Sequence, residues 1–125
     1  MEEQFTPVAE GDVKNALKRR PLLVLFYMDG CSHCISTLPH WKEMAKKYPK
    51  CEAIQIESSM VEMSGEKGVN GYPTMKYKPK KGRERVLSGE QGSASEIARK
   101  LGLLSRFTRR NTRRLRRASR RSLRH

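Results

Sequence analysis

The stretch from Leu22 to Cys34, LLVLFYMDGCSHC, joins a continuous apolar run to two cysteines separated by two residues. The run from Leu22 to Tyr27 has the length of one strand, and a strand without polar alternation is expected where helices cover both faces of a sheet. After the cysteines, apolar side chains recur at helical spacing at Ile35, Leu38, Trp41, Met44 and Ala45. The stretch therefore predicts a buried strand that delivers a Cys-x-x-Cys pair to the start of a helix.

The rest of the chain continues the alternation of helices and strands. Asp12 is a candidate cap for the first helix, Ser93 and Glu96 form a capping-box pattern for the last, and the turn sequence PKKG indicates a hairpin. Helices are predicted over 13–20, 31–48 and 93–104, and strands over 22–27, 51–58, 74–78 and 84–88. This order is typical of an α/β fold with a mixed central sheet of four to five strands flanked by helices.

The length of 125 residues suits one compact domain, and the charge divides the chain into two regions. All 13 acidic residues lie at or before Glu96, whereas Ser105 to His125 contains ten arginines and no acid. Without those ten, 17 of the 27 lysines and arginines remain, so the first region carries a formal charge of only +4. We predict a folded domain over 1–104 and a disordered basic tail over 105–125, because dense like charge cannot form a core.

The cysteine count limits the chemistry of the pair. Three cysteines are too few, and odd in number, for a disulfide scaffold. At a helix start, unpaired amides and the helix dipole stabilise an anion, which favours Cys31 as a thiolate nucleophile and Cys34 as the resolving thiol. Two alternatives remain: a zinc site, which would need ligands from His33, His40 or Cys51, and a purely structural bridge. Cys51 itself is expected either to pack in the core or to be a peripheral reactive thiol.

Three motifs together resemble a known family. They are LFYMDGCSHC at 25–34, Pro39 five residues after Cys34, and VNGYPTMKYK at 69–78. In this order they resemble a thioredoxin-fold domain of the protein disulfide isomerase type, over residues 5–104. The resemblance implies a thioredoxin fold and a thiol-disulfide oxidoreductase with a Cys31–Cys34 redox pair and no metal or organic cofactor. It further implies protein thiol or disulfide clients, a redox partner and a monomeric state.

The resemblance also assigns supporting roles. Tyr72–Pro73 would be a cis peptide bond that faces the two sulfurs, and the plainer interpretation is a turn proline. His33 resembles the histidine before the second cysteine of the isomerase motif, where an imidazolium would stabilise the Cys31 thiolate; the plainer interpretation is an exposed loop histidine. Pro39 would kink the active-site helix.

The sequence departs from the family pattern at several positions, among them Ser32 in place of a glycine and Asp29–Gly30 in place of Pro-Trp or Glu-Trp. Gly30 stands where an exposed aromatic residue usually precedes the first cysteine. Leu25 stands at the position of a buried acid, and Gln55 at that of its lysine partner on the next strand. A neutral pair avoids the cost of burying charge but removes a group that carries protons to and from the second cysteine. We expect slower resolution, or a substitute proton carrier such as Glu57, Asp29 or water.

The arginine-rich tail suggests a polyanion as a partner. Repeated arginines with one aromatic residue among them suit phosphate neutralisation rather than base reading, which favours nucleic acid. An anionic membrane surface, an import receptor or a solvated tail remain alternatives. The candidate contacts are Arg109, Arg110, Arg113, Arg114, Arg116, Arg117, Arg120 and Arg121. A second basic cluster surrounds the predicted hairpin and contains Lys78, Lys80, Lys81 and Arg83.

The N-terminus bears on location. It is acidic and lacks the basic and apolar regions of a signal peptide, and no apolar run is long enough to span a bilayer, so we expect synthesis in the cytosol. The domain is also similar to small isomerase-like domains without a signal peptide that large DNA viruses encode, which suggests a nuclear or virion-associated location. In an alternative interpretation, the protein is a nucleic-acid-binding structural component whose thioredoxin-like domain is a folded head.

Overall fold

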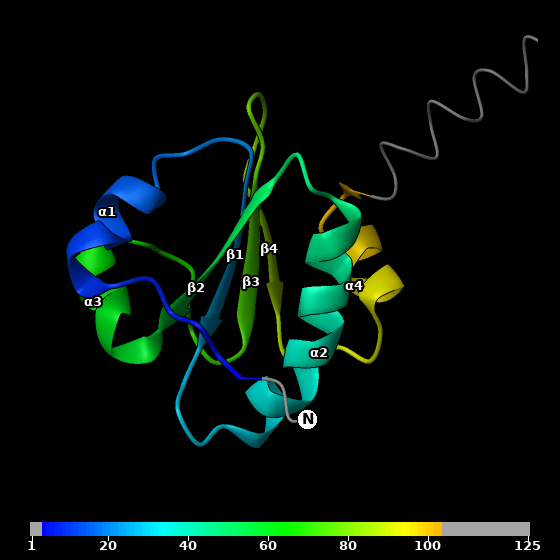
Figure 1. Ribbon diagram of the computed structural model, residues 1–125, viewed down its shortest axis with the longest axis horizontal. Helices are drawn as coiled ribbons and strands as arrows, with labels where there is room; N and C mark the ends of the chain where they lie inside the picture. The colour runs from blue at the N-terminus through cyan, green and yellow to red at the C-terminus, as the bar shows by residue number, and fades with distance from the viewer. Residues whose placement is uncertain (1–3, 104–125) are drawn as a thin grey trace, which may run out of the picture.

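The structure of the protein is a computed structural model that describes residues 4–103. Its strands form one central sheet with helices on both faces (Figure 1). The strands are β1 (Leu22–Tyr27), β2 (Glu52–Glu57), β3 (Thr74–Lys78) and β4 (Arg85–Ser88). The α-helices are α1 (Val13–Ala16), α2 (Ser32–Lys47), α3 (Val61–Ser64) and α4 (Ala94–Lys100), and two short 3-10 helices, η1 (Glu10–Asp12) and η2 (Ser58–Met60), precede α1 and α3.

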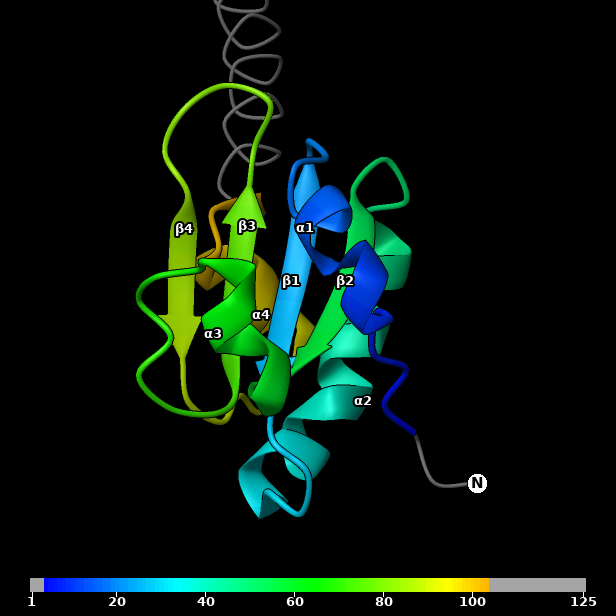
Figure 2. The same ribbon diagram turned by 90° about the vertical axis from the view of Figure 1, so that its left-hand side faces the viewer.

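The sheet is mixed, with the strand order β2-β1-β3-β4. β1 pairs in parallel with β2, in a register that sets Leu25 beside Gln55 and Tyr27 beside Glu57. β3 and β4 form the predicted hairpin, and β3 pairs antiparallel with β1. Figure 2 shows the sheet face on, with the carboxyl ends of β1 and β2 at the same end of the sheet. The connection from β1 to α2 and the start of β3 therefore lie at this end of the sheet.

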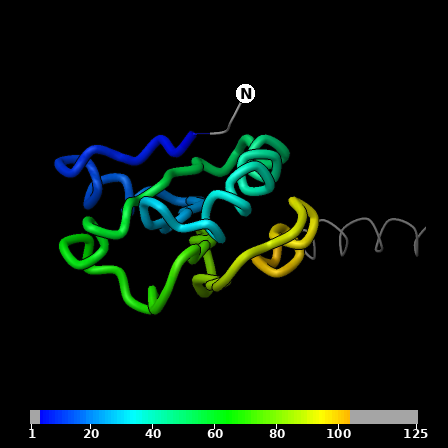
Figure 3. The backbone as a smooth tube through the Cα atoms, turned by 90° about the horizontal axis from the view of Figure 1, so that it is seen from below, coloured from blue at the N-terminus to red at the C-terminus, as the bar shows by residue number. Residues whose placement is uncertain are grey.

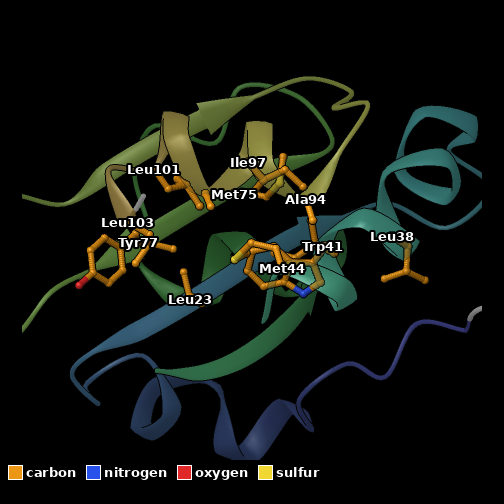
Figure 4. Close-up of a cluster of buried hydrophobic side chains, with 12 residues drawn as sticks. Leu23, Leu38, Trp41, Met44, Met75, Tyr77, Ala94, Ile97, Leu101 and Leu103 are labelled. Atoms are coloured by element: carbon orange, nitrogen blue, oxygen red, sulfur yellow. The ribbon is translucent and has the colours of Figure 1, made fainter. Parts of the chain in front are cut away.

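Each face of β1 enters a separate core. Side chains alternate along a strand, so Leu23 and Leu25 face α2 and α4. The alternate side chains, Leu22, Val24 and Phe26, face α1. Figure 4 shows the first cluster, in which Trp41 and Met44 of α2 lie with Ile97 of α4. Every residue of β1 is buried, as predicted for a strand that is covered on both faces.

The predicted strands and the long central helix are confirmed, but two helices end earlier than predicted. α1 ends at Ala16 instead of Arg20, because the next residues form a tighter turn in which the Arg19 N–H donates to the Ala16 carbonyl at 3.2 Å. The side chain of Asp12 does not cap this helix. α4 ends at Lys100, two residues before a glycine whose φ of 82° is incompatible with a right-handed helix.

Residues 104–125 lie outside the described part of the chain. The domain boundary at 104, the disorder of the tail and the arginine contacts within 105–125 therefore stay predictions. Within residues 4–103, no helix has the length and the apolar character that crossing a membrane would require.

A buried ionic cluster ties β3 to the connection that precedes it. The ammonium of Lys76, a residue only 1% exposed, donates to the Lys67 carbonyl at 2.5 Å and lies 3.4 Å from the carboxylates of both Glu66 and Glu84. Lys78 lies 2.7 and 3.2 Å from the same two carboxylates. This corrects the predicted surface cluster: Lys78 is buried and paired with acids, because a charge on a covered strand face requires partners.

The N-terminal segment lies along the outer edge of β2 (Figure 2). The Val8 N–H donates to the Gln55 carbonyl at 2.9 Å, and the Thr6 N–H donates to the side-chain oxygen of Gln55, also at 2.9 Å. Phe5 stacks on Tyr27 with ring centroids 3.9 Å apart. The segment therefore reaches the end of the sheet at which the cysteine pair lies.

Candidate active site

The cysteine pair lies where β1 ends and α2 begins, at the end of the molecule from which Figure 3 is viewed. Cys31 is the N-cap of α2, and its sulfur accepts a hydrogen bond from the Cys34 N–H at 3.2 Å. Both cysteines are free thiols, but Cys31 is partly exposed whereas Cys34 is fully buried. A sulfur within reach of solvent at a helix start can attack a disulfide, and a buried sulfur one turn later can resolve the product.

The peptide before β3 approaches the same sulfur. The Tyr72–Pro73 bond is cis, as predicted, and the Cys31 thiol donates to the Tyr72 carbonyl at 3.8 Å. The Pro73 carbonyl in turn accepts the Gly89 N–H at 2.9 Å, which links this peptide to the end of β4. A second cis bond, Arg20–Pro21, lies before β1, and no motif in the sequence indicated it.

The surroundings of the buried sulfur favour its protonated form. Burial, followed by the hydrogen bond with the Cys31 side chain, raises the pKa of Cys34 to about 12, while a hydrogen bond from the Met28 backbone acts in the opposite direction. At neutral pH Cys34 is therefore a thiol. Its attack on the Cys31 sulfur requires a group or a water molecule that takes up the proton.

His33 is turned toward the segment before α4. Its Nδ1 lies 2.9 Å from Oε2 of Glu90, and both side chains are substantially exposed. Hydrogen bonds from Ser36 and then His33 hold the pKa of Glu90 below its usual range. No pattern in the sequence indicates Glu90 as a site residue, because a local pattern cannot connect two residues that are 57 positions apart.

Leu25 and Gln55, which the resemblance equates with a buried acid and its lysine partner, are neighbours in the sheet; the equivalence itself stays a prediction. Leu25 is fully buried and lies beside Gln55 on β2. The Gln55 side chain holds the N-terminal segment through the Thr6 N–H. The pair is neutral, and the Gln55 side chain has a structural role as the acceptor for the N-terminal segment.

Of the substitute proton carriers, Glu57 lies at the end of β2 beside Tyr27. Hydrogen bonds from the side chains of Ser59 and Ser58 hold the pKa of Glu57 below its usual range. Glu57 is therefore ionised at neutral pH and is a weak proton acceptor for a thiol whose pKa is about 12.

The remaining sequence candidates are placed as follows. Among residues 4–103, no three or more His, Cys, Asp or Glu side chains are arranged to hold a metal ion, so the zinc alternative has no ligand set in this part of the chain. Cys51 is partly buried and packs against the core beneath α2. Burial raises the pKa of its thiol, which agrees with the packing interpretation.

Comparison with known proteins agrees with this geometry. The family model described as thioredoxin matches residues 5–101. The chain belongs to the thioredoxin family. Over 63 residues it is 33% identical to protein disulfide-isomerase 1 of Caenorhabditis elegans, a match that covers 48% of this chain and 13% of the isomerase. The chain thus spans only a small part of the length of that relative.

Solved structures of thioredoxin domains have the same fold. Mitochondrial thioredoxin 3 of Saccharomyces cerevisiae, 21% identical, matches with a TM-score of 0.60 over 75% of this chain and 92% of that chain. The first thioredoxin domain of mouse protein disulfide-isomerase A4, 25% identical, matches with a TM-score of 0.58 over 75% and 70% of the two chains. The predicted thioredoxin fold with its mixed sheet is confirmed, and family membership together with the cysteine pair supports a thiol-disulfide oxidoreductase.

Proposed function

We propose that this thioredoxin-family protein is a thiol-disulfide oxidoreductase that acts on protein thiols and disulfides through Cys31 and Cys34. The observation that carries the proposal is the difference in exposure between two sulfurs that lie within one helical turn beside a cis-proline peptide. A client disulfide has access to the Cys31 sulfur. The buried Cys34 sulfur reacts instead with the adjacent Cys31 sulfur of the mixed disulfide. Tyr72 and Pro73 support the site because the Tyr72 carbonyl accepts a hydrogen bond from the Cys31 thiol. His33 is a further supporting residue, and its ring is held by Glu90.

In the reducing direction, the Cys31 thiolate attacks one sulfur of a client disulfide, which forms a mixed disulfide and releases the other client sulfur as a thiolate that takes up a proton. Cys34 then loses its proton and attacks the Cys31 sulfur, so the Cys31–Cys34 disulfide forms and the first client sulfur leaves. Two electrons pass from the pair to the client, and a redox partner restores the dithiol. The reverse steps oxidise a client dithiol, and the reduction potential of the pair decides the direction.

Single substitutions of the three cysteines test these roles. Cys34→Ser should accumulate mixed disulfides with clients, because Cys31 still attacks but nothing releases the product, whereas Cys31→Ser should trap none. Non-reducing electrophoresis with mass spectrometry measures the trapped species. Cys51→Ser is the matched control and should behave like the parent protein. Equal trapping by the Cys31 and Cys34 variants would show that the nucleophile is wrongly assigned.

A second activity is favoured by the charge of the tail. Residues 105–125 contain ten arginines and no acid, and we infer that they bind nucleic acid or another polyanion through phosphate contacts. Such binding would concentrate the redox domain on nuclear or packaged nucleic acid, and a nuclear or virion-associated location is proposed on this basis. If the protein is instead a structural nucleic-acid-binding component, a chain that lacks both Cys31 and Cys34 should keep its biological function.

A further inference from the structure

A groove with a volume of about 1220 Å³ lies next to the cysteine pair, between the N-terminal segment, the ends of β1 and β2, and the first turns of α2. Gly30, the residue directly before Cys31, is part of its lining. The groove lies on the opposite flank of the α2 start from the His33–Glu90 pair, since Ile35 and Pro39 line it. The groove therefore begins one residue away from the nucleophile along the chain.

The walls of the groove are mainly apolar. They include the stacked rings of Phe5 and Tyr27, and Ile35 and Pro39 from α2. Ile35 is 55% exposed and Met28 is 45% exposed, so two of the three large hydrophobic side chains that the described residues expose lie within four positions of Cys31. Apolar surface that is left open beside a nucleophile is suited to bury a side chain of the molecule that it attacks.

The charged side chains of the groove are both acidic. Asp29 and Glu57 line it, and no lysine or arginine is present among its lining residues, in a chain whose formal net charge is +14. Glu57 is ionised at neutral pH, because hydrogen bonds from Ser59 and Ser58 lower its pKa. The lining side chains thus carry charge of the opposite sign to the net charge of the chain, which favours a positively charged ligand.

We infer that the groove binds the segment of a client protein that flanks the reacting cysteine, and that this segment carries an apolar side chain and a lysine or arginine. The apolar side chain lies against Phe5 and Ile35, and the basic side chain lies between Asp29 and Glu57. The inference rests on the proposed oxidoreductase function and names the clients that the same site prefers. Gly30, between Cys31 and the groove in the sequence, adds no side chain of its own to the lining.

Three disulfide-linked peptides test the inference with the full chain in its dithiol form. Each contains one cysteine followed by Leu-Arg, Leu-Glu or Ser-Arg, and this cysteine forms a disulfide with the same small uncharged chromophoric thiol. Cys31 attacks the peptide sulfur and releases that thiol as a thiolate, whose absorbance in a stopped-flow instrument gives the rate constant. The Leu-Arg peptide should react about tenfold faster than the Leu-Glu peptide at low salt. The carboxylates of Asp29 and Glu57 lie at an exposed site, where each changes the ratio of the two rate constants by a few-fold. The ratio should shrink as salt is added.

Substitutions assign the preference to the groove. Asp29→Asn combined with Glu57→Gln should lower the Arg-to-Glu ratio to about twofold or less. Ile35→Ser should lower the preference for leucine over serine. Glu52→Gln removes an equal charge at an exposed position at the opposite end of β2 from Glu57 and is the matched control, for which the ratio should persist. An unchanged ratio in the double variant, or an equal loss in Glu52→Gln, would overturn the inference.

Reduction of a small uncharged disulfide distinguishes a failure of the groove from a failure of the proposed function. A chain that reduces this disulfide but attacks all three peptides equally retains the function and refutes client binding in the groove. A chain that reduces neither the small disulfide nor the peptides refutes the function itself.

Nuclear Overhauser contacts in the peptide-free protein identify the occupant of the groove. Contacts from the arginines of 105–125 to Phe5 or Ile35 would mean that the tail fills it. Concentration-dependent shifts of the same two residues would assign the groove to a second copy of the chain. Either result would overturn a client as the occupant, whereas the absence of both, together with the Arg-to-Glu preference, supports it.

Discussion

The two cysteines differ in their exposure to solvent, and this difference gives them different roles in the proposed reaction. Cys31 is partly exposed and donates to the Tyr72 carbonyl, so it is both accessible and oriented. Cys34 is fully buried, and burial raises its pKa to about 12. The second step of the proposed reaction therefore depends on how the Cys34 proton leaves.

The pH dependence of that step is the first expectation at the residue scale. Because its pKa lies near 12, Cys34 is almost entirely protonated at pH 7, and its thiolate fraction rises about tenfold for each pH unit below that value. The rate of resolution of a mixed disulfide at Cys31 should rise accordingly between pH 7 and 9. Stopped-flow release of a fluorescent thiol measures this rate. A plateau below pH 9 would indicate that a protein group already removes the proton.

Restoring the missing acid is the second expectation. Leu25→Glu should lower the free energy of unfolding by about 2–4 kcal/mol, because it removes a buried apolar side chain and buries a polar one. It should also speed resolution near neutral pH, since a buried carboxyl with a raised pKa can accept the Cys34 proton.

Leu25→Gln is the control for this change, because it has a similar size and a similar cost in stability without a titratable group. Urea denaturation and stopped-flow resolution measure the two effects. Equal resolution rates for Leu25→Glu and Leu25→Gln from pH 6 to 9 would show that the site does not use a buried proton carrier.

Two elements hold the site in place. α2 begins at the Cys31 N-cap, where the sulfur itself accepts the Cys34 N–H, so the start of the helix and the geometry of the redox pair depend on each other. β3 follows the cis-proline peptide and carries Lys76, whose ammonium is anchored to Lys67 and to two carboxylates. The connection that presents Tyr72 to Cys31 is thereby fixed at both of its ends.

The anchoring by β3 gives an expectation at the scale of the element. Lys76→Met should reduce the free energy of unfolding by about 2–4 kcal/mol, because it leaves the Lys67 carbonyl without its donor and removes one cation from a buried ionic cluster. Lys80→Met, at an exposed position of the adjacent turn, should change it by less than about 0.5 kcal/mol. Urea denaturation compares the two. Similar losses in both variants would mean that the cluster contributes little to stability.

At the scale of the whole molecule, charge is divided between a folded domain and a basic tail. The described domain pairs its buried charges internally, as in the Lys76 and Lys78 cluster, and has an acidic groove beside the cysteines. The surplus of arginine lies in 105–125. The proposed redox chemistry and the proposed polyanion binding therefore reside in separate parts of the chain.

Truncation after Leu104 should separate the two activities. It should abolish binding to duplex DNA or RNA, which in the full chain should weaken with salt with a log-log slope of about −5 to −9 and depend little on sequence. Turnover of a small disulfide and the melting temperature should change little, because the site residues lie before the truncation. Filter binding, a turnover assay and calorimetry measure the three quantities. Nucleic-acid binding that survives truncation would point to the exposed Lys80, Lys81 and Arg83.

The strands, the long helix and the position of the cysteine pair could be predicted from the amino-acid sequence alone. A strand buried on both faces has to be apolar throughout, as Leu22 to Tyr27 is, and a helix that covers a sheet has to repeat its apolar residues at helical spacing. The family motifs added the cis peptide at Pro73. Each of these features is written in a short window of residues, so it can be recognised before the fold is known.

Which charged and polar groups meet depends on the tertiary structure. His33 with Glu90, Lys76 with Glu66, and Gln55 with Thr6 are pairs whose members lie 57, 10 and 49 positions apart. Periodicity indicates which face a side chain occupies but not which partner lies opposite. For the same reason the sequence groups Lys78 with the basic residues of the hairpin, although Lys78 is buried with two glutamates. The acidic groove beside Cys31 likewise exists only because the N-terminal segment folds back to the ends of β1 and β2.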